Sequence, residues 1–297
     1  MGYFRGMEFR ADLALFVIAI MWGVTFLPMA EALKTNGVFT ILFYRFSIAT
    51  LLMLVILLKM RHKFDKPSFY RGVALGVLLF FGFWTQTEAL KYTFSSTVAF
   101  ITGLNVIFTP FIVLVLFKDR LSVYALVGAF LAAFGLYYLS AAELGVGLGE
   151  VLSTACAIFY SFEIIFAGRF VRKYNLYTLV ITELFVVAVL SFFGAFFTEN
   201  RAIAVWDSVF INTLIITSFF ATFVAFLVQN WAQKFTSSAK TSLILTFEPV
   251  SAGFIGYFWG AEMLTSTQLM GAGLIMLGIL ISELGGAVFS KKASDKK

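Results

Sequence analysis

Residues 89–93 read Ala89-Leu90-Lys91-Tyr92-Thr93, and residues 232–236 read Ala232-Gln233-Lys234-Phe235-Thr236. Both pentapeptides belong to a longer self-match, in which residues 80–139 align with residues 223–282 without a gap. The identical pairs include Phe80/Phe223, Gln86/Gln229, Lys91/Lys234, Gly128/Gly271 and Gly135/Gly278. A gapless repeat of this length predicts that the chain contains two copies of one structural unit.

A second match precedes the first at a slightly different offset. It pairs Trp22 with Tyr160, Thr40 with Thr178 and Arg45 with Glu183. The change of offset fits a longer loop around residues 198–207 in the second copy. We therefore place the repeats at residues 11–140 and 149–286, within a single membrane domain of residues 1–297, and a basic tail at 287–297.

The composition is that of a membrane protein. Hydrophobic residues make up 61% of the 297 residues, charged residues make up 13%, and the mean hydropathy is +0.94. Soluble domains are only about half apolar. With just four Pro in the chain, the sequence leaves little room for disordered linkers or an appended soluble module.

Apolar windows of about 20 residues, the length that crosses a bilayer as a helix, predict ten spans. They are 12–30, 38–58, 72–90, 96–117, 121–140, 149–168, 176–197, 208–231, 238–259 and 265–286. Each repeat holds five, and because five is odd, the second repeat enters the membrane from the opposite side. The expected fold class is an all-α polytopic membrane protein of two inverted five-helix repeats, an arrangement typical of secondary transporters.

The distribution of basic residues predicts the orientation. If the N-terminus is cytoplasmic, 18 of the 22 Lys and Arg residues fall in cytoplasmic segments and only Lys34, Lys91 and Arg201 fall outside. This bias places both termini in the cytoplasm. It also accounts for the net charge of +6, so the charge gives no reason to expect a nucleic-acid partner.

The residue inventory argues against several classes of function. A single Cys156 and a single His62 exclude an intramolecular disulfide and metal sites built from cysteine or histidine. The sequence carries no phosphate-binding loop, so a nucleotide motor is not expected. A membrane enzyme would need clustered catalytic groups, and a channel would show a repeated filter, so both are the weaker alternatives to a carrier. We expect no cofactor and no metal.

Short motifs in both repeats carry a family resemblance. They are Trp22-Gly23, Tyr44-Arg45-Phe46, Ala89-Leu90-Lys91-Tyr92-Thr93, Phe247-Glu248-Pro249-Val250 and Gly260-Ala261-Glu262-Met263-Leu264. With these motifs in this order, the chain resembles the EamA-type branch of the drug/metabolite transporter (DMT) superfamily. The resemblance implies a multi-pass carrier of small organic solutes in the inner membrane, often an exporter. It also implies a cavity lined by spans 1–4 and 6–9, with spans 5 and 10 peripheral.

Proline positions depart from the family pattern. The family often has Pro in the fourth span where this chain has Val106, whereas Pro110 stands four residues later. The ninth span keeps Pro249 at the matching position of the second repeat. Because proline removes a helical hydrogen bond, we expect Pro110 and Pro249 to mark gate bends, with the first bend displaced by about one turn.

Charges in the middle of apolar spans are the first candidates for function. Arg45 and its repeat mate Glu183 each lie near the centre of a span. A charge at that depth costs about 3 kcal/mol, so it is expected to face a partner or a water-filled cavity. Arg45 is either a helix brace or a substrate ligand, and Glu183 is either its partner or a proton site.

Polar stripes on two other spans extend the candidate set. They comprise Thr102, Asn105 and Thr109 in the fourth span and Thr241, Glu248 and Ser251 in the ninth. Glu163 lies one turn from Tyr160 in the sixth. The candidate substrate ligands are Trp22, Arg45, Trp84, Thr102, Asn105, Tyr160, Glu163, Glu248 and Ser251. The candidate proton-coupling residues are Glu163, Glu183 and Glu248, since a buried, unpaired carboxylate tends to take up a proton.

The sequence thus predicts a secondary transporter that moves a small metabolite, an amino acid or a similar zwitterionic or amphipathic solute, by alternating access as an exporter. Nucleobases, organic cations or drugs are alternative substrates. The expected partners are the substrate, coupling protons and membrane lipid. The protein is expected to be a monomer or a weak homodimer.

Overall fold

The apolar windows of the sequence fold into helices joined by short turns. The computed structural model describes residues 2–59, 64–118, 122–139, 147–199, 203–259 and 265–294, and these residues contain no strand. The motif at 260–264, His62 and residues 295–297 lie outside the described part of the chain.

Helices occupy each predicted window, although several are interrupted or differ at their ends. In chain order they are α1 (Gly2–Ala32), α2 (Val38–Lys59), α3 (Lys66–Ala89), α4 (Ser95–Thr102), α5 (Asn105–Phe117), α6 (Val123–Leu139), α7 (Leu148–Phe170), α8 (Leu176–Thr198), α9 (Ser208–Leu214), the π-helical segment η2 (Ile215–Val224), α10 (Ala225–Ala232), α11 (Ser238–Leu245), α12 (Phe247–Trp259) and α13 (Ser266–Ser294). The last helix continues beyond the predicted end at residue 286 into the basic tail.

Seven of the described helical segments are long and apolar enough to cross a membrane. They are Gly6–Ala32, Val38–Lys59, Lys66–Ala89, Thr97–Phe117, Leu148–Phe170, Leu176–Thr198 and Ser208–Ala232. Shorter apolar helices cover Val123–Tyr138 and Leu269–Ser282. Large exposed side chains such as Phe111, Phe130 and Phe197 give the helices an apolar outer surface, as expected where lipid replaces water.

Side chains in the turns fix where several helices begin. Asn175 Oδ1 accepts hydrogen bonds from the backbone N–H groups of Tyr177 (3.0 Å) and Thr178 (3.1 Å) and so caps α8. Asp207 caps α9 in the same way, through the N–H of Phe210 at 2.7 Å. These caps satisfy donors that the first turn of a helix leaves free.

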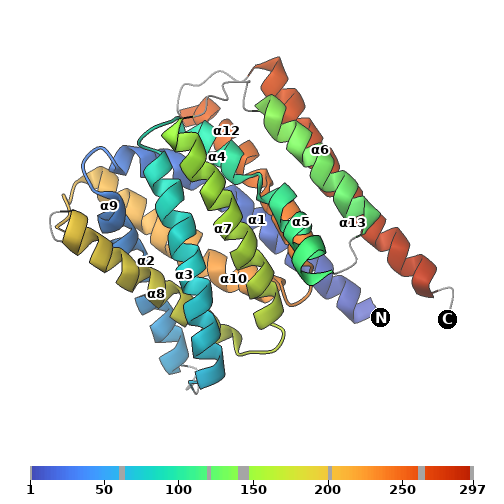
Figure 1. Ribbon diagram of the computed structural model, residues 1–297, viewed down its shortest axis with the longest axis horizontal. Helices are drawn as coiled ribbons and strands as arrows, with labels where there is room; N and C mark the ends of the chain where they lie inside the picture. Colours follow the sequence, from blue (N-terminus) through green and yellow to red (C-terminus); the bar gives the residue numbers. More distant parts are fainter. Residues whose placement is uncertain are drawn as a thin grey trace.

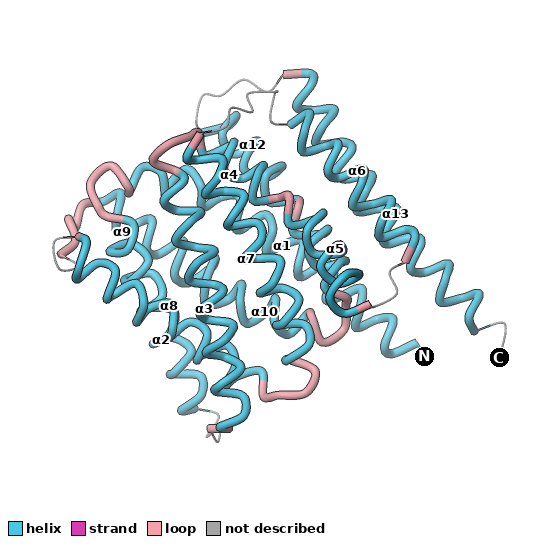
Figure 2. The backbone as a smooth tube through the Cα atoms, viewed as in Figure 1, coloured by secondary structure: helices cyan, strands magenta, loops and turns pink. Residues whose placement is uncertain are grey.

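Helices α6 and α13 form an antiparallel pair at one edge of the bundle, as Figures 1 and 2 show. Glycines allow their backbones to approach: a Cβ on Gly128 would lie 2.6 Å from the carbonyl oxygen of Gly278, and one on Gly135 would lie 2.6 Å from that of Gly271. The two glycine pairs recognised in the repeat therefore pack against each other within the chain. The predicted peripheral position of these two helices is confirmed.

The helix breaks differ from the prediction based on proline. The first break lies at Gly103–Leu104, between α4 and α5, and the second lies at Thr246, between α11 and α12. These positions correspond to each other in the repeat alignment, so the break in the first half is not displaced towards Pro110. Pro110 lies within α5, whereas Pro249 lies in the first turn of α12, where a missing N–H costs little.

Candidate functional site

A cavity lies between helices of both halves near the helix breaks. Its wall comprises Trp22, Thr25, Phe26, Met29, Arg45, Leu79, Phe83, Gln86, Thr87, Leu90, Asn105, Tyr160, Glu163, Ile164, Phe226, Gln229, Leu245 and Glu248. The space inside it that is open to water-sized molecules is about 40 Å³, enough for only a few waters. A metabolite would therefore require the surrounding helices to move apart.

Arg45 of α2 is held across the bundle by the π-helical segment η2. Its Nε donates to Thr222 Oγ1 at 2.7 Å, and its Nη2 donates to the carbonyl oxygen of Ala221 at 3.4 Å. The guanidinium also lies 4.6 Å from the ring centroid of Phe83, a favourable cation–π distance. Its side chain is 3% exposed, and among the described residues no carboxylate oxygen lies within ion-pair distance of it.

Glu248 is positioned by an unusually close approach of α12 to α1. A Cβ on Gly23 would lie 1.8 Å from Ser251 Oγ and 2.6 Å from the Glu248 carbonyl oxygen. Ser251 Oγ donates to the carbonyl oxygens of Glu248 (2.8 Å) and Ala19 (3.2 Å), which ties the two helices together. Glu248 interacts electrostatically with Arg45 across the cavity. The close packing of α12 on α1 thus explains why glycine follows Trp22 in this motif.

Several polar atoms at the cavity wall lack a hydrogen-bond partner within the described structure. They are Gln86 Nε2, Asn105 Oδ1, Glu163 Oε1 and Gln229 Oε1. Tyr160 already donates to Gln86 Oε1 at 3.1 Å, and Trp22 Nε1 donates to the Ala221 carbonyl at 2.8 Å. Because a buried polar group without a partner costs free energy, these atoms are suited to bind water or a polar solute.

Comparison with known proteins agrees with this architecture. The sequence profile of the EamA-like transporter family matches residues 9–141 and again residues 147–284. The chain belongs to the EamA-like transporter family. An uncharacterized transporter of Archaeoglobus fulgidus is 35% identical over 274 residues, which cover 92% of this chain and 86% of the relative. The uncharacterized transporter YyaM of Bacillus subtilis is 25% identical over 257 residues, covering 80% and 81% of the two chains.

A protein whose crystal structure is known shares the fold of this EamA-like chain. The two superpose with a TM-score of 0.76 at 18% sequence identity, over 93% of this chain and 96% of the other. The predicted resemblance to the EamA branch of the DMT superfamily is confirmed. The protein is a multi-pass membrane transporter, and the names of its family and relatives indicate a transporter and not an enzyme.

The structure brings six of the nine predicted substrate ligands of this EamA-like protein to one cavity. These are Trp22, Arg45, Asn105, Tyr160, Glu163 and Glu248. Ser251 bonds to backbone carbonyls, and Thr102 Oγ1 donates to Cys156 Sγ at 3.8 Å. Trp84 packs with Phe39 at a centroid distance of 5.7 Å. These three residues lie outside the set that lines the cavity.

The carboxylates do not pair as their repeat positions suggested. Glu183 lies on α8 beside Glu163 and Asn230, and it is not a neighbour of Arg45. Of the three predicted proton-coupling residues, Glu163 and Glu248 line the cavity and Glu183 lies behind its wall.

Two glutamines outside the predicted ligand set also lie at the cavity wall. Gln86 accepts a hydrogen bond from Tyr160, and Gln229 Nε2 donates to Glu163 Oε2 at 3.1 Å. The signal that could have identified them was their identity in both repeats. Thr222 had no such signal, because its role depends on the π-helical turn that presents it to Arg45.

The two ends of the EamA-like bundle differ in their polar contacts. Where α1 and α11 begin, Lys240 Nζ binds Asp12 Oδ2 at 2.7 Å and Glu8 Oε1 at 3.0 Å. Nearby, Arg172 Nη2 donates to the Thr236 carbonyl at 2.7 Å, which ties the end of α7 to the turn before α11. We call these contacts the clasp.

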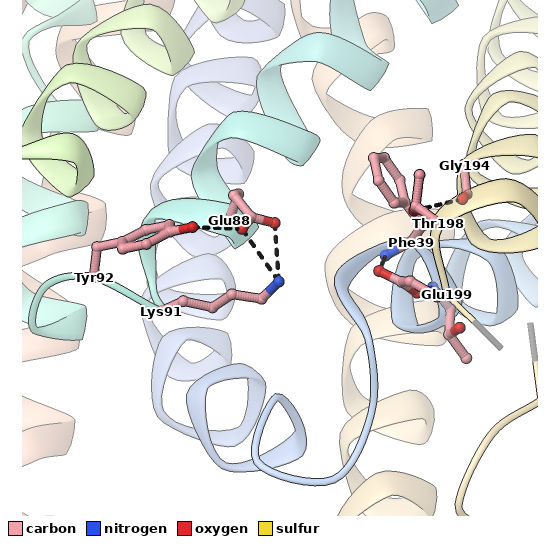
Figure 3. A network of polar contacts seen from close by, with 8 residues as sticks. Phe39, Glu88, Lys91, Tyr92, Gly194, Thr198 and Glu199 are labelled. Carbon is pink, nitrogen blue, oxygen red and sulfur yellow. Dashed lines mark hydrogen bonds and ion pairs between the residues drawn. The ribbon is translucent and has the colours of Figure 1, made fainter.

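The opposite end carries local contacts and also hydrogen bonds that join the turn after α1 to residues 199–207, such as the pair between Asn36 and Val205 at 3.2 and 2.8 Å. Figure 3 shows part of this end in close view. Glu88 accepts from Lys91 Nζ and from Tyr92 Oη, both within a few residues along the chain. Glu199 reaches the start of α2 and accepts from the N–H of Phe39 at 2.9 Å. The cavity wall includes Met29 and Leu90, near the ends of α1 and α3. The cavity therefore extends towards this end and away from the clasp.

Proposed function

We propose that the protein is a secondary transporter that moves a small organic metabolite across the inner membrane by alternating access, as an exporter. The supporting observation is the buried cavity between the two halves, where Arg45 interacts with Glu248, where Glu163 also lines the wall, and where several polar atoms have no partner in the described structure. An amino acid or similar zwitterion would place its carboxylate near Arg45 and its ammonium group near the carboxylates.

The proposed topology has ten spans, two inverted repeats and both termini in the cytoplasm. The antiparallel packing of α6 on α13 supports inversion, because these helices correspond in the repeat alignment. The double match of the family profile supports two units. In this orientation the clasp faces the cytoplasm, and the cavity extends towards the outer face. The structure then represents a state that is closed to a metabolite, with its cavity nearer the outer face.

The topology predicts that two equivalent lysine positions are labelled from opposite sides of the membrane. Lys91 and Lys234 follow equivalent helices, α3 and α10, so Lys91→Cys should react with a membrane-impermeant maleimide from outside the cell and Lys234→Cys only after the membrane is opened. The native Cys156 is buried. Both variants are made in Cys156→Ser protein, and labelling of Cys156→Ser alone gives the background signal. Labelling of both positions from the same side would refute the inverted repeat.

The unequal ends of the bundle support alternating access. In the repeat alignment, Lys240 corresponds to Thr97, so the outer end has no copy of this lysine. The cytoplasmic end is tied by the ion pair between Lys240 and Asp12, whereas the outer end is tied by hydrogen bonds such as those between Asn36 and Val205. Because the contacts differ in kind, opening the two ends would have different free-energy costs.

Organic cations are the second candidate substrates. Two buried carboxylates, Glu163 and Glu183, and the half-buried Glu248 accompany one buried arginine in or beside the cavity. The excess of acidic groups favours a solute, or a co-transported ion, with positive charge. A thermal-shift screen of the purified protein over amino acids, polyamines, nucleosides and cationic dyes separates these classes, and saturable uptake with counterflow in liposomes separates a carrier from a channel.

We expect Glu248→Gln to retain substrate binding and to lose the acceleration of transport by a pH gradient. Glutamine keeps the size of the side chain but cannot exchange a proton. The measurement is liposome transport with and without a pH gradient, alongside the thermal shift with substrate. Glu163→Gln is the parallel variant, and Glu88→Gln, which changes a carboxylate at the outer end, is the control. Unchanged coupling in both cavity variants would exclude the proton role.

A further inference from the structure

A cluster of four buried polar side chains lies behind and beside the cavity wall. Glu163 of α7, Glu183 of α8, and Gln229 and Asn230 of α10 are each at most 2% exposed. Each has one side-chain oxygen without a hydrogen-bond partner in the described structure: Glu163 Oε1, Glu183 Oε1, Gln229 Oε1 and Asn230 Oδ1. We call this group the oxygen cluster.

The members of the oxygen cluster are joined in a closed circuit of neighbours. Gln229 Nε2 donates to Glu163 Oε2 at 3.1 Å, and Asn230 Nδ2 lies 3.5 Å from Glu183 Oε2. Glu163 and Glu183 interact directly with each other, while Gln229 and Asn230 are adjacent in the chain. The amide N–H groups thus reach one oxygen of each carboxyl group, and the two carboxyl groups lie within hydrogen-bond distance of each other.

No cation of the described protein compensates this pair of carboxylates. The ion pairs in the described residues involve Lys34, Lys91 and Lys240, all at the ends of the bundle. Arg45 interacts with Glu248 and Tyr160 instead. Burial of two uncompensated carboxylates is very unfavourable, so the cluster requires either a proton on one of the two carboxyl groups or a positive ion from outside the chain.

The equivalent residues of the first repeat include a positive charge that the second repeat lacks. In the repeat alignment the four cluster residues correspond to Thr25, Arg45, Gln86 and Thr87, and all four of these line the cavity. That half carries its own cation in Arg45 at the position where the second half carries Glu183. A mobile cation in the oxygen cluster would therefore restore to the second half the charge that the first half contains.

We propose that the oxygen cluster binds one Na⁺ ion, which enters from the cavity past Glu163 and Gln229. Carboxylate and amide oxygens are the ligands that hard cations prefer, and carriers built from repeats can hold Na⁺ near the midplane of the membrane. Only Glu163 and Gln229 of the four residues line the cavity, so an ion would reach the site between these two side chains.

Divalent ions fit the site less well. Mg²⁺ keeps several waters and Ca²⁺ takes six to eight oxygen ligands, whereas four side-chain oxygens are available and each residue is almost fully buried. The use of Na⁺ as a coupling ion rests on the proposed carrier function. It gives Glu163 and Glu183 a Na⁺ role in addition to their candidate proton role, and it leaves Glu248 as a candidate for proton exchange alone. This site is also distinct from the cysteine and histidine metal sites that the sequence excludes.

Na⁺-dependent stability of the purified protein tests the site without any substrate. Replacing choline chloride by NaCl at constant ionic strength and pH should raise the unfolding temperature by about 3–5 °C once Na⁺ exceeds its Kd tenfold. Glu183→Gln, which keeps the shape of the side chain and lies outside the cavity wall, should abolish this rise. Glu88→Gln, the same change at the outer end, should keep it.

Several outcomes of this test would contradict the Na⁺ site. Wild-type protein that responds equally to NaCl, KCl and choline chloride, or more strongly to Mg²⁺ or Ca²⁺, would overturn it. A response to pH alone would replace it with a protonated carboxyl pair. If Glu183→Gln does not fold, Glu163→Gln takes its place, and a Na⁺ response that persists in either variant also refutes the assignment. Na⁺ binding in a protein that transports no solute would separate this proposal from the carrier function.

Discussion

Arg45→Lys is expected to lower the rate of substrate transport about 100-fold, the equivalent of losing two charge-assisted hydrogen bonds. Lysine keeps the positive charge, but its ammonium group cannot reproduce the planar contacts of the guanidinium with Thr222, Ala221 and Phe83. The initial rate of uptake into liposomes, measured over a range of substrate concentrations, gives the effect on KM and on the maximal rate.

A matched variant on η2 tests whether Arg45 is a brace between helices or a substrate ligand. Thr222→Val removes the acceptor of Arg45 Nε and leaves the guanidinium in place, and Thr222 is not among the residues that line the cavity. If Arg45 binds substrate, Arg45→Lys should raise KM far more than Thr222→Val does. If both variants lower the unfolding temperature equally and leave KM unchanged, Arg45 is a brace between α2 and η2 and the proposed ligand role is wrong.

The sequence could predict the helices because lipid imposes a simple rule on them. A backbone without water must satisfy its own hydrogen bonds, so apolar windows became helices with turns of a few residues between them. The position of α6 against α13 was also predictable, since glycines at matching positions of both repeats indicate close packing. The differences occur at helix ends, where α13 continues to Ser294 beyond its apolar part.

The breaks within helices could not be placed from proline alone. Proline removes one hydrogen bond, but the position of a break depends on tertiary contacts. A Cβ on Gly103 would lie 3.0 Å from Leu136 Cδ2, so α6 packs directly on the interrupted turn. The π-helical segment η2 was equally unpredictable, because its sequence Ile215–Val224 has ordinary helical composition and its geometry depends on the bundle around it.

The candidate site was predicted in part for a similar reason. Depth in the membrane identified Arg45, Glu163, Glu183 and Glu248 as unusual. Their pairing depends on how the two repeats rotate against each other, which a sequence alignment does not contain. Arg45 and Glu183 correspond in sequence, yet the repeats place them in separate environments: Arg45 faces the cavity and Glu183 joins the oxygen cluster. Equivalent positions are related by symmetry and need not be in contact.

Among the glycines whose surroundings the structure describes, Gly23 should tolerate an added methyl group least, so Gly23→Ala is expected to destabilise the protein strongly. The added Cβ would lie 2.6 Å from the Glu248 carbonyl oxygen and 2.8 Å from the Ala252 backbone nitrogen, and no rotamer change moves backbone atoms. Helix α12 must shift away from α1, at a cost of about 1–3 kcal/mol. We expect the unfolding temperature of the purified protein to fall by about 5 °C.

Gly273→Ala is the matched control, because a Cβ at Gly273 of α13 would meet nothing within 4 Å. There alanine should raise stability by about 0.5–1 kcal/mol through its higher helix propensity. Both variants replace a helical glycine by alanine. If Gly23→Ala lowers the unfolding temperature and Gly273→Ala raises it, the loss comes from the contact between α1 and α12. Since the shift at Gly23 also moves Glu248 and Ser251, transport should fall in Gly23→Ala but not in Gly273→Ala. Equal unfolding temperatures for both variants would mean that α1 and α12 are further apart than described, and that Glu248 is not fixed by their packing.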